Sequence, residues 1–140
     1  MGKATFSLFQ YIILNVRAHQ IIILQTKLEY DIILIMSWVY LLVAALFEVG
    51  WPFGLKMADI SAVKIWWIIF AVIAMALSGI FLYMAQKEIP IGTAYAVWTG
   101  IGASCTFLLG VAVFHDAMSL MRFLGVVFII IGVTLLKIGH

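Results

Sequence analysis

One acidic residue lies in the middle of an apolar stretch of this sequence. Between residues 39 and 55 the only charged side chain is that of Glu48, and Lys56 ends the stretch. An ionisable group at the centre of a membrane-spanning helix costs about 2.5–3.5 kcal/mol, so such a group normally faces a bundle interior or a water-filled cavity. We therefore expect Glu48 to bind a ligand. The competing interpretation is a protonated, purely structural glutamic acid that is hydrogen-bonded to a neighbouring helix.

The chemistry open to such a carboxylate is the exchange of protons for a cation. Apolar surroundings favour the protonated form of a carboxylate, and a second carboxylate nearby favours it further. Two copies of Glu48 across a dimer interface can therefore hold protons near neutral pH and release them when a cation arrives. That exchange is the minimum machinery for proton–cation antiport.

Aromatic and hydroxyl side chains recur at positions that suit a cation site. Trp51 follows Glu48 by one helical turn on the same face, and Tyr95 and Trp98 have the same spacing further along the chain. A cation between carboxylates and aromatic faces gains both Coulomb attraction and cation–π contact. Ser78 can hydrogen-bond a carboxylate. The alternatives are aromatic side chains that only pack or anchor the helices, and a serine that bonds its own backbone.

Glycine and proline residues predict weak points in the helices near these positions. Pro52 lies between Gly50 and Gly54, which predicts a bend just after the carboxylate. Gly100 and Gly102 similarly weaken the middle of a later apolar stretch. Hinges near a binding residue suit alternating access. Breaks that serve only close helix packing are the equal alternative.

A second pair of glycines predicts a contact between helices. Gly125 and Gly132 are seven residues apart in the last apolar stretch, so they leave one smooth face on a helix. A dimer contact is the natural use of such a face.

The composition places these residues in a membrane. The chain of 140 residues is 66% hydrophobic and 10% charged, with a mean hydropathy of +1.23, whereas a soluble domain is about half apolar and a quarter charged. A bilayer core about 30 Å thick needs about 20 mostly apolar residues per helix. We therefore predict an all-α membrane protein, a four-transmembrane-helix bundle with spans at 39–55, 65–85, 91–114 and 120–136.

The connections 57–64, 86–90 and 115–119 are short, so neighbouring helices must run antiparallel. Three basic residues of the core then lie on one side of the membrane and two on the other, which leaves almost no orientation preference. Such a chain can insert both ways, which permits an antiparallel dimer of identical subunits. Residues 1–35 would add three basic residues to the weaker side. The three core residues on one side are Lys56, Lys64 and Arg122, and the two on the other side are Lys87 and Lys137. The three in the extension are Lys3, Arg17 and Lys27.

The N-terminal extension, residues 1–35, differs from the transporter core, residues 36–140. Charged and polar residues interrupt its apolar runs, so no stretch is long and apolar enough to span a bilayer, and the ordered parts of a signal peptide are missing. One interpretation is an interfacial helix. We favour a start codon assigned too far upstream, because Met36-Ser37-Trp38 opens the first predicted span cleanly.

Other kinds of chemistry lack their sequence signatures. The net charge of +2 comes without a basic cluster, so nucleic acid is not an expected partner. A single cysteine excludes an internal disulfide and a cysteine-based zinc site, and the histidines share no ligand spacing, so we expect no metal and no cofactor. Without a second acid, a nucleophile–base pair or a phosphate loop, we expect no enzyme. The single cysteine is Cys105, and the histidines are His19, His115 and His140.

Together these features resemble the small multidrug resistance family of bacterial transporters. The resemblance covers residues 36–140, and nothing in 1–35 matches. It implies an antiparallel, dual-topology homodimer in the bacterial plasma (inner) membrane, where both copies of the glutamate form one shared site. The segments that carry it are Phe47-Glu48-Val49 with Trp51, Leu55-Lys56, Pro90-Ile91-Gly92-Thr93-Ala94-Tyr95-Ala96-Val97-Trp98-Thr99-Gly100-Ile101-Gly102, the glycines of the fourth span, and Leu136-Lys137.

Within that family, Trp51 and the segment Gly92-Thr93-Ala94-Tyr95 are similar to the guanidinium-exporter branch. The resemblance implies proton-coupled export of small organic cations, with Glu48 binding both substrate and protons. By position, Trp51 and Ser78 would support Glu48. Tyr95 and Trp98 would wall the site. A planar guanidinium also pairs with a carboxylate through two parallel hydrogen bonds, which suits this substrate.

Two positions depart from that branch. Ala45 stands where glycine is usual, and Gly50-Trp51-Pro52 differs from the commoner forms. These departures keep two alternatives open. One is an exporter of quaternary ammonium or other lipophilic cations. The other is a subunit that works only as a heterodimer with a paralogous partner, without transport of its own.

Overall fold

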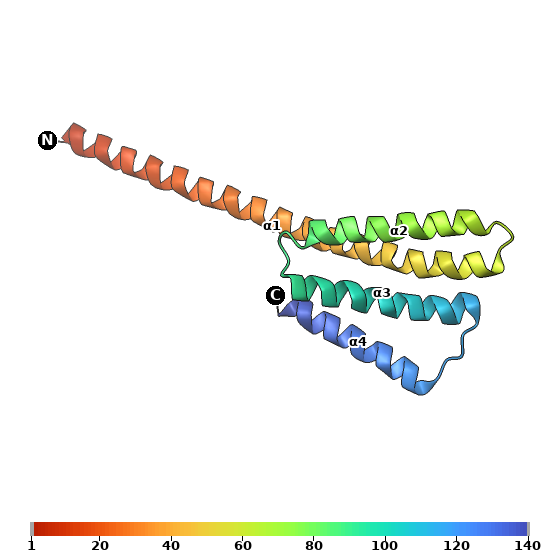
Figure 1. Ribbon diagram of the computed structural model, residues 1–140. Helices are drawn as coiled ribbons and strands as arrows, with labels where there is room; N and C mark the ends of the chain where they lie inside the picture. The colour runs from red at the N-terminus through yellow and green to blue at the C-terminus, as the bar shows by residue number, and fades with distance from the viewer. Residues whose placement is uncertain (1, 140) are drawn as a thin grey trace. The chain divides into compact units, whose positions relative to one another are not determined.

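Four helices make up the chain, as the sequence predicts. The computed structural model describes the backbone of residues 2–139 and the side chains of residues 14–139; the side chain of Lys3 and all of His140 lie outside this part. All four helices are long and apolar enough to cross a membrane, which confirms the all-α transmembrane architecture. In chain order they are α1 (Gly2–Ile60), α2 (Lys64–Ala85), α3 (Ile91–Phe114) and α4 (Leu120–Ile138) (Figure 1).

The chain divides into two compact units, Met1–Ile35 and Met36–His140. The first unit is helical in its described part and presents its large apolar side chains to the exterior, among them Leu24 and Leu28. The second unit holds the rest of α1 together with α2, α3 and α4. Whether the first unit belongs to the natural protein stays a prediction.

Helix α1 is longer than the span predicted for it. It continues without interruption through Pro52 and past Lys56, ending only at Ile60. Pro52 has no backbone N–H, so the carbonyl of Glu48 receives no helical hydrogen bond from four residues ahead. The proline therefore leaves a missing bond beside the carboxylate, within a helix that continues.

Small residues hold α1 and α2 close together. A Cβ atom added at Gly50 would lie 3.2 Å from Ala74 Cβ, and one added at Gly54 would lie 3.1 Å from Ala71 Cβ. Between membrane helices, small side chains let the backbones approach closely, and the resulting van der Waals contacts hold the pair. These two glycines, which the sequence associated with a bend, lie at the contact between α1 and α2.

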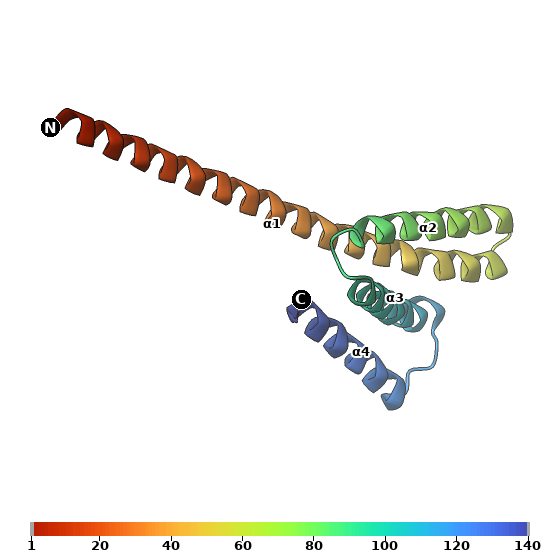
Figure 2. The same ribbon diagram turned by 60° about the vertical axis from the view of Figure 1, so that its left-hand side comes forward.

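Helices α3 and α4 meet through Gly100. An added Cβ at this position would clash with Val133, and it would lie 3.2 Å from Ile129 Cγ2. By contrast, an added Cβ at Gly125 or Gly132 would meet nothing within 4 Å. The two glycines predicted to form a smooth face are thus open within this subunit. Figures 1 and 2 show α4 diverging from α3 toward the connection that joins them.

The buried core lies at one end of this unit, between α1, α3 and the connection that follows α2. Leu41 and Ile89 are its largest fully buried side chains. The α2–α3 connection and the C-terminal end of α4 lie at this end, whereas the α1–α2 and α3–α4 connections lie at the other (Figure 1). The Lys137 ammonium lies 5.4 Å from the centre of the Trp38 ring, a cation–π contact between α4 and α1.

Most of the molecule's apolar surface faces outward. In α4 the only buried residue is Val126, and large side chains such as Met121 and Phe128 are at least 70% exposed. A soluble protein would bury such a surface, but lipid solvates it without cost. The exposed faces are therefore in contact with the bilayer or with another membrane helix.

Candidate functional site

A hydrogen-bonded cluster joins three helices at the carboxylate of Glu48. Ser78 Oγ on α2 lies 3.1 Å from Glu48 Oε2 on α1 and 2.9 Å from the carbonyl oxygen of Ala44. The indole Nε1–H of Trp98 on α3 donates to the same Ser78 oxygen over 3.0 Å. In these contacts the Ser78 hydroxyl bonds to α1 and α3, and not to the backbone of its own helix, which was the alternative interpretation.

The local packing explains why this cluster is in the interior. Ser78 is only 1% exposed, and Ala44 beside it is fully buried. Alanine at 44 leaves room for the hydroxyl to reach the α1 backbone one turn before Glu48. The Glu48 side chain itself is half-buried, so its carboxylate combines a buried hydrogen-bond donor with an accessible side.

Two hollows open on either side of the Glu48 side chain, and both are lined by Glu48 and Trp51. The first has a volume of about 270 Å³ and includes Ser78 and Trp98. The second has a volume of about 340 Å³ and lies toward Thr99 and Thr106 of α3. No charged residue other than Glu48 lines either hollow in the described part of the chain. A cation that entered would therefore meet one carboxylate and no competing positive charge.

The aromatic residues take up different places around this site. Trp51 borders both hollows, and Trp98 borders one of them. The rings of Tyr95 and Trp98 contact each other, with centres 5.2 Å apart and planes tilted by 55°. Tyr95 is 55% exposed and lines neither hollow, so within one subunit it contacts the site through Trp98.

Gly102 makes room for the carboxylate. A Cβ atom added at this position would lie 2.9 Å from Glu48 Cγ and 3.4 Å from Glu48 Cβ. Contacts of 2.9 Å between carbon atoms are repulsive, so any side chain here would displace Glu48. Both Gly100 and Gly102 thus lie at close contacts, which supports the interpretation that they serve helix packing. Helix α3 continues through both glycines without interruption.

The sequence reasoning missed part of the lining. Thr99 and Thr106 border the second hollow and Met75 borders the first. The signal for the threonines was present, because Thr99, Gly102 and Thr106 follow the spacing i, i+3, i+7 that defines one face of a helix. Ala44 was also missed, and no pattern could reveal it, because its contribution is a backbone carbonyl.

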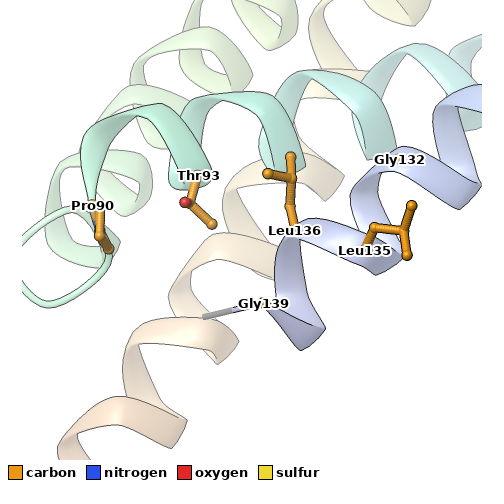
Figure 3. A pocket seen from close by; sticks show the side chains of 6 residues that line it. All are labelled: Pro90, Thr93, Gly132, Leu135, Leu136 and Gly139. Carbon is orange, nitrogen blue, oxygen red and sulfur yellow. The ribbon is translucent and has the colours of Figure 1, made fainter.

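A hollow larger than these two lies elsewhere in this unit. It has a volume of about 630 Å³ and lies between the start of α3 and the last turns of α4, where it is lined by Thr93, Gly132 and Leu135, among others (Figure 3). None of its lining residues is charged. A smaller hollow of about 230 Å³ at the opposite end contains Lys56 and Asp116. Neither includes Glu48, so size does not identify the site.

The described residues contain no group of three or more His, Cys, Asp and Glu side chains that could hold a metal ion. The thiol of Cys105 is free and half-buried. The Glu48 carboxylate can bind protons and cations reversibly, assisted by neutral hydrogen-bond donors and aromatic rings.

Comparison with known proteins agrees with the four-helix fold. The sequence profile described as Small Multidrug Resistance protein matches residues 36–129. A protein named "Guanidinium exporter" from Yersinia pseudotuberculosis is 42% identical over 104 residues, which cover 74% of this chain and 99% of that protein. Proteins of the same name from Proteus vulgaris and Escherichia coli K12 are 40% and 38% identical over 104 residues, with 74% of this chain and 99% and 98% of those proteins covered.

The matched region contains Glu48, Ser78 and Trp98, all of α2 and α3, and part of α1 and of α4. The relatives are bacterial proteins, and nearly their whole length matches 74% of this chain. Four spanning helices and this kinship make the chain a multi-pass protein of the bacterial inner membrane. It belongs to the small multidrug resistance family.

Proposed function

We propose that this protein exports small organic cations, guanidinium-type compounds foremost, in exchange for protons. The observation that carries the proposal is the Glu48 carboxylate, which lies between two hollows with aromatic walls and without another charged group. Relatives that this chain matches over nearly their whole length are named guanidinium exporters. Membership in a transporter family also favours a transporter over an enzyme.

Each residue of the site has a distinct role in this proposal. Glu48 binds the cation or protons, and it cannot hold both at full strength. Ser78 donates a hydrogen bond to the carboxylate, and Trp98 in turn donates to Ser78. Trp51 offers its ring to the bound cation from either hollow, while Tyr95 braces Trp98. A guanidinium suits this arrangement because it is planar, pairs with a carboxylate through two N–H groups and stacks on aromatic rings.

A second copy of the chain completes the site in this proposal. The core's basic residues are nearly balanced between the two membrane sides, so both orientations are accessible and an antiparallel homodimer can form. The exposed side chains of α4, and the space at Gly125 and Gly132, where an added Cβ meets nothing within 4 Å, allow a close helix contact for that dimer. The two Glu48 residues would then share protons and substrate. Gly100 and Gly102 would serve packing first, with Pro52 adding local freedom beside Glu48.

The test is exchange of guanidinium for protons in proteoliposomes that contain the full-length protein. Wild-type protein is expected to acidify or alkalise the lumen according to the guanidinium gradient, and Glu48→Gln is expected to stop this exchange. Glu88→Gln is the matched control, because Glu88 is exposed in the α2–α3 connection. Transport that survives Glu48→Gln would refute the proposal.

A broader exporter of quaternary ammonium cations is the second candidate. The observation in its favour is the open, largely apolar character of both hollows, with Met75 and Leu82 in one of them. Ala45, the position that departs from the guanidinium-exporter branch, is fully buried and lines neither hollow, so it does not reshape the walls directly. Comparing guanidinium with tetraethylammonium in the same assay separates the candidates. A heterodimer would show itself if activity required a co-expressed paralogue.

A further inference from the structure

Three polar groups converge on one hydroxyl oxygen in the interior of the protein. Ser78 Oγ is within hydrogen-bond distance of Glu48 Oε2, at 3.1 Å, and of the Ala44 carbonyl, at 2.9 Å. It also receives the N–H of Trp98 at 3.0 Å. A serine hydroxyl has one proton to donate and two lone pairs to accept with. The proton cannot serve both the carboxylate and the carbonyl at the same time.

The protonation state of Glu48 decides which acceptor receives this proton. An ionised Glu48 can only accept, so Ser78 must donate to it, and this charge-assisted bond is stronger than one to a neutral carbonyl. A protonated Glu48 can donate its own hydrogen to Ser78 Oγ. The hydroxyl then accepts from both Glu48 and Trp98, which occupies both lone pairs, and its own proton is free for the Ala44 carbonyl. In each state the hydroxyl proton has an acceptor, and only in the protonated state are both lone pairs occupied.

We propose that Ser78 is a positioning residue that moves its single hydroxyl proton between Glu48 and the Ala44 carbonyl as Glu48 loses and gains its proton. The inference rests on the proposed function, since it makes the hydrogen bond of this hydroxyl depend on the protonation state of the transport carboxylate. When Glu48 is protonated, a hydrogen bond links α2 to the backbone of α1. When Glu48 is ionised, that backbone link is absent and α2 is bonded to the carboxylate.

The position of the second acceptor gives this exchange a structural consequence. Ala44 precedes Glu48 by four residues, so in a continuous α-helix its carbonyl already accepts the backbone N–H of Glu48. The Ser78 hydroxyl thus acts on the turn of α1 that carries the carboxylate. On the other side of Glu48, Pro52 leaves the Glu48 carbonyl without a helical donor. The carboxylate therefore lies between two turns of α1. The turn before it is hydrogen-bonded to Ser78 only when Glu48 is protonated, and the turn after it lacks one backbone hydrogen bond.

The hollows around Glu48 have no second titratable group among the described residues. The residues that line them come from α1, α2 and α3, and none besides Glu48 is charged or titratable. Tyr95 contacts Trp98 through its ring and is largely exposed. A pH-dependent change at Ala44 therefore reports Glu48.

The sequence provides a selective probe of the Ala44 carbonyl. Ala44-Ala45 is the only pair of consecutive alanines in the chain. Full-length protein that carries ¹³C at alanine carbonyls and ¹⁵N at alanine amides therefore has one doubly labelled peptide bond, and NMR in lipid can select the Ala44 carbonyl through it. We expect its ¹³C resonance to move upfield as the pH is raised, because it loses a hydrogen bond. The midpoint should coincide with the pH at which guanidinium binding is half-maximal.

Three variants isolate the contribution of Ser78. Ser78→Ala is expected to abolish the pH-dependent shift at Ala44, and Glu48→Gln is expected to do the same. Ser104→Ala is the matched control, since Ser104 is also a buried hydroxyl but donates to the Gly100 carbonyl of its own helix, at 2.7 Å. It should leave the shift unchanged. Ser78→Ala should also weaken guanidinium binding by about fivefold at acidic pH, where protons compete, with little change at alkaline pH.

The outcomes separate the inference from the proposed function. A wild-type protein that binds guanidinium with a pH dependence, yet shows a constant Ala44 resonance, overturns the inference and leaves the function standing. A shift that persists in Ser78→Ala overturns it as well. Uniform weakening of binding at every pH in Ser78→Ala indicates a merely structural serine and counts against it. Guanidinium binding retained by Glu48→Gln would instead remove the proposed function. The wild-type titration alone decides the matter if Ser78→Ala does not fold.

Discussion

The space around Glu48 is set by a residue without a side chain. An added Cβ at Gly102 would lie 2.9 Å from Glu48 Cγ, so Gly102→Ala must push the glutamate off its present rotamer. Such a displacement costs about 0.5–1.5 kcal/mol. We expect guanidinium affinity to fall roughly twofold to tenfold, as measured by isothermal titration of protein in detergent.

Gly92→Ala provides the comparison for this change. The substitution is chemically the same, but Gly92 is exposed and an added Cβ there meets nothing within 4 Å. Its affinity should equal that of the wild type. Equal affinities for both variants would mean that the Glu48 rotamer does not govern binding.

Competition at Glu48 predicts the sign of the pH dependence. Protons and cations bind to the same carboxylate, so guanidinium affinity should decrease as the pH is lowered and reach its highest value once Glu48 is ionised. Two such sites in a dimer titrate as a pair, so the profile gives values for the pair rather than for one residue. The measurement is a series of equilibrium titrations from acidic to alkaline pH. A flat profile would contradict the shared site, and Glu88→Gln should retain the wild-type profile.

At the scale of the helix, the contact between α1 and α2 depends on Gly54. An added Cβ there would lie 2.8 Å from Phe70 Cδ1 and 3.1 Å from the carbonyl oxygen of Trp67. The aromatic ring can move, but the backbone oxygen cannot do so without shifting α2. We expect Gly54→Ala to lower the free energy of unfolding by about 1–3 kcal/mol, as overpacking does. Unfolding by sodium dodecyl sulfate in mixed micelles measures this change.

The control for the helix contact is an alanine at an open glycine. Gly132→Ala introduces no contact within 4 Å in the subunit and replaces glycine with a better helix former. A dimer that packs through this glycine would be weakened, so the comparison is made with monomeric protein in micelles, where Gly132→Ala should be neutral or stabilising. If Gly54→Ala were equally neutral, the close contact would not hold α1 and α2 together.

At the scale of the whole molecule, all residues of the proposed transport site lie within the unit Met36–His140. The relatives named guanidinium exporters are matched over nearly their full length by 104 residues of this chain. We therefore expect protein truncated to 36–140 to exchange guanidinium for protons at the rate of the full chain. Removing Arg17 and Lys27 also restores the nearly even charge of the core, so both orientations should be more equally populated.

Two measurements test this expectation. Rates in proteoliposomes compare the full and truncated chains. Labelling of a cysteine added after the last residue, in a Cys105→Ser background, from either side of the membrane reports orientation. Loss of exchange on truncation would show that the extension contributes to function. Mass spectrometry of the natively expressed protein decides whether residue 1 begins the natural chain, and a main species that starts there would contradict our preference for a downstream start.

Much of the fold and part of the site follow from the sequence alone. The lengths of the apolar stretches predicted four helices, because lipid leaves no other way to satisfy the backbone of such segments. Glu48 stood out because a charge within a span is costly, and the spacing of one helical turn placed Trp51 with it. Trp98 was assigned to the site through the family resemblance. The end of α1 was predicted too early, because a terminal lysine does not stop a helix whose backbone bonds are already satisfied.

Only the tertiary structure decided what these residues do to one another. Sequence spacing determines which side chains share a face of one helix, but contacts between helices depend on how closely the backbones approach. The small residues at Ala44 and Gly102 allow α2 and α3 to reach Glu48, and that approach joins Ser78 and Trp98 into one hydrogen-bonded cluster. The sequence by itself determined that an intramembrane carboxylate exists and that aromatic residues accompany it. The structure determined that its partner is a hydroxyl with two acceptors, because a backbone carbonyl such as that of Ala44 is identical in every residue and has no signature in a sequence.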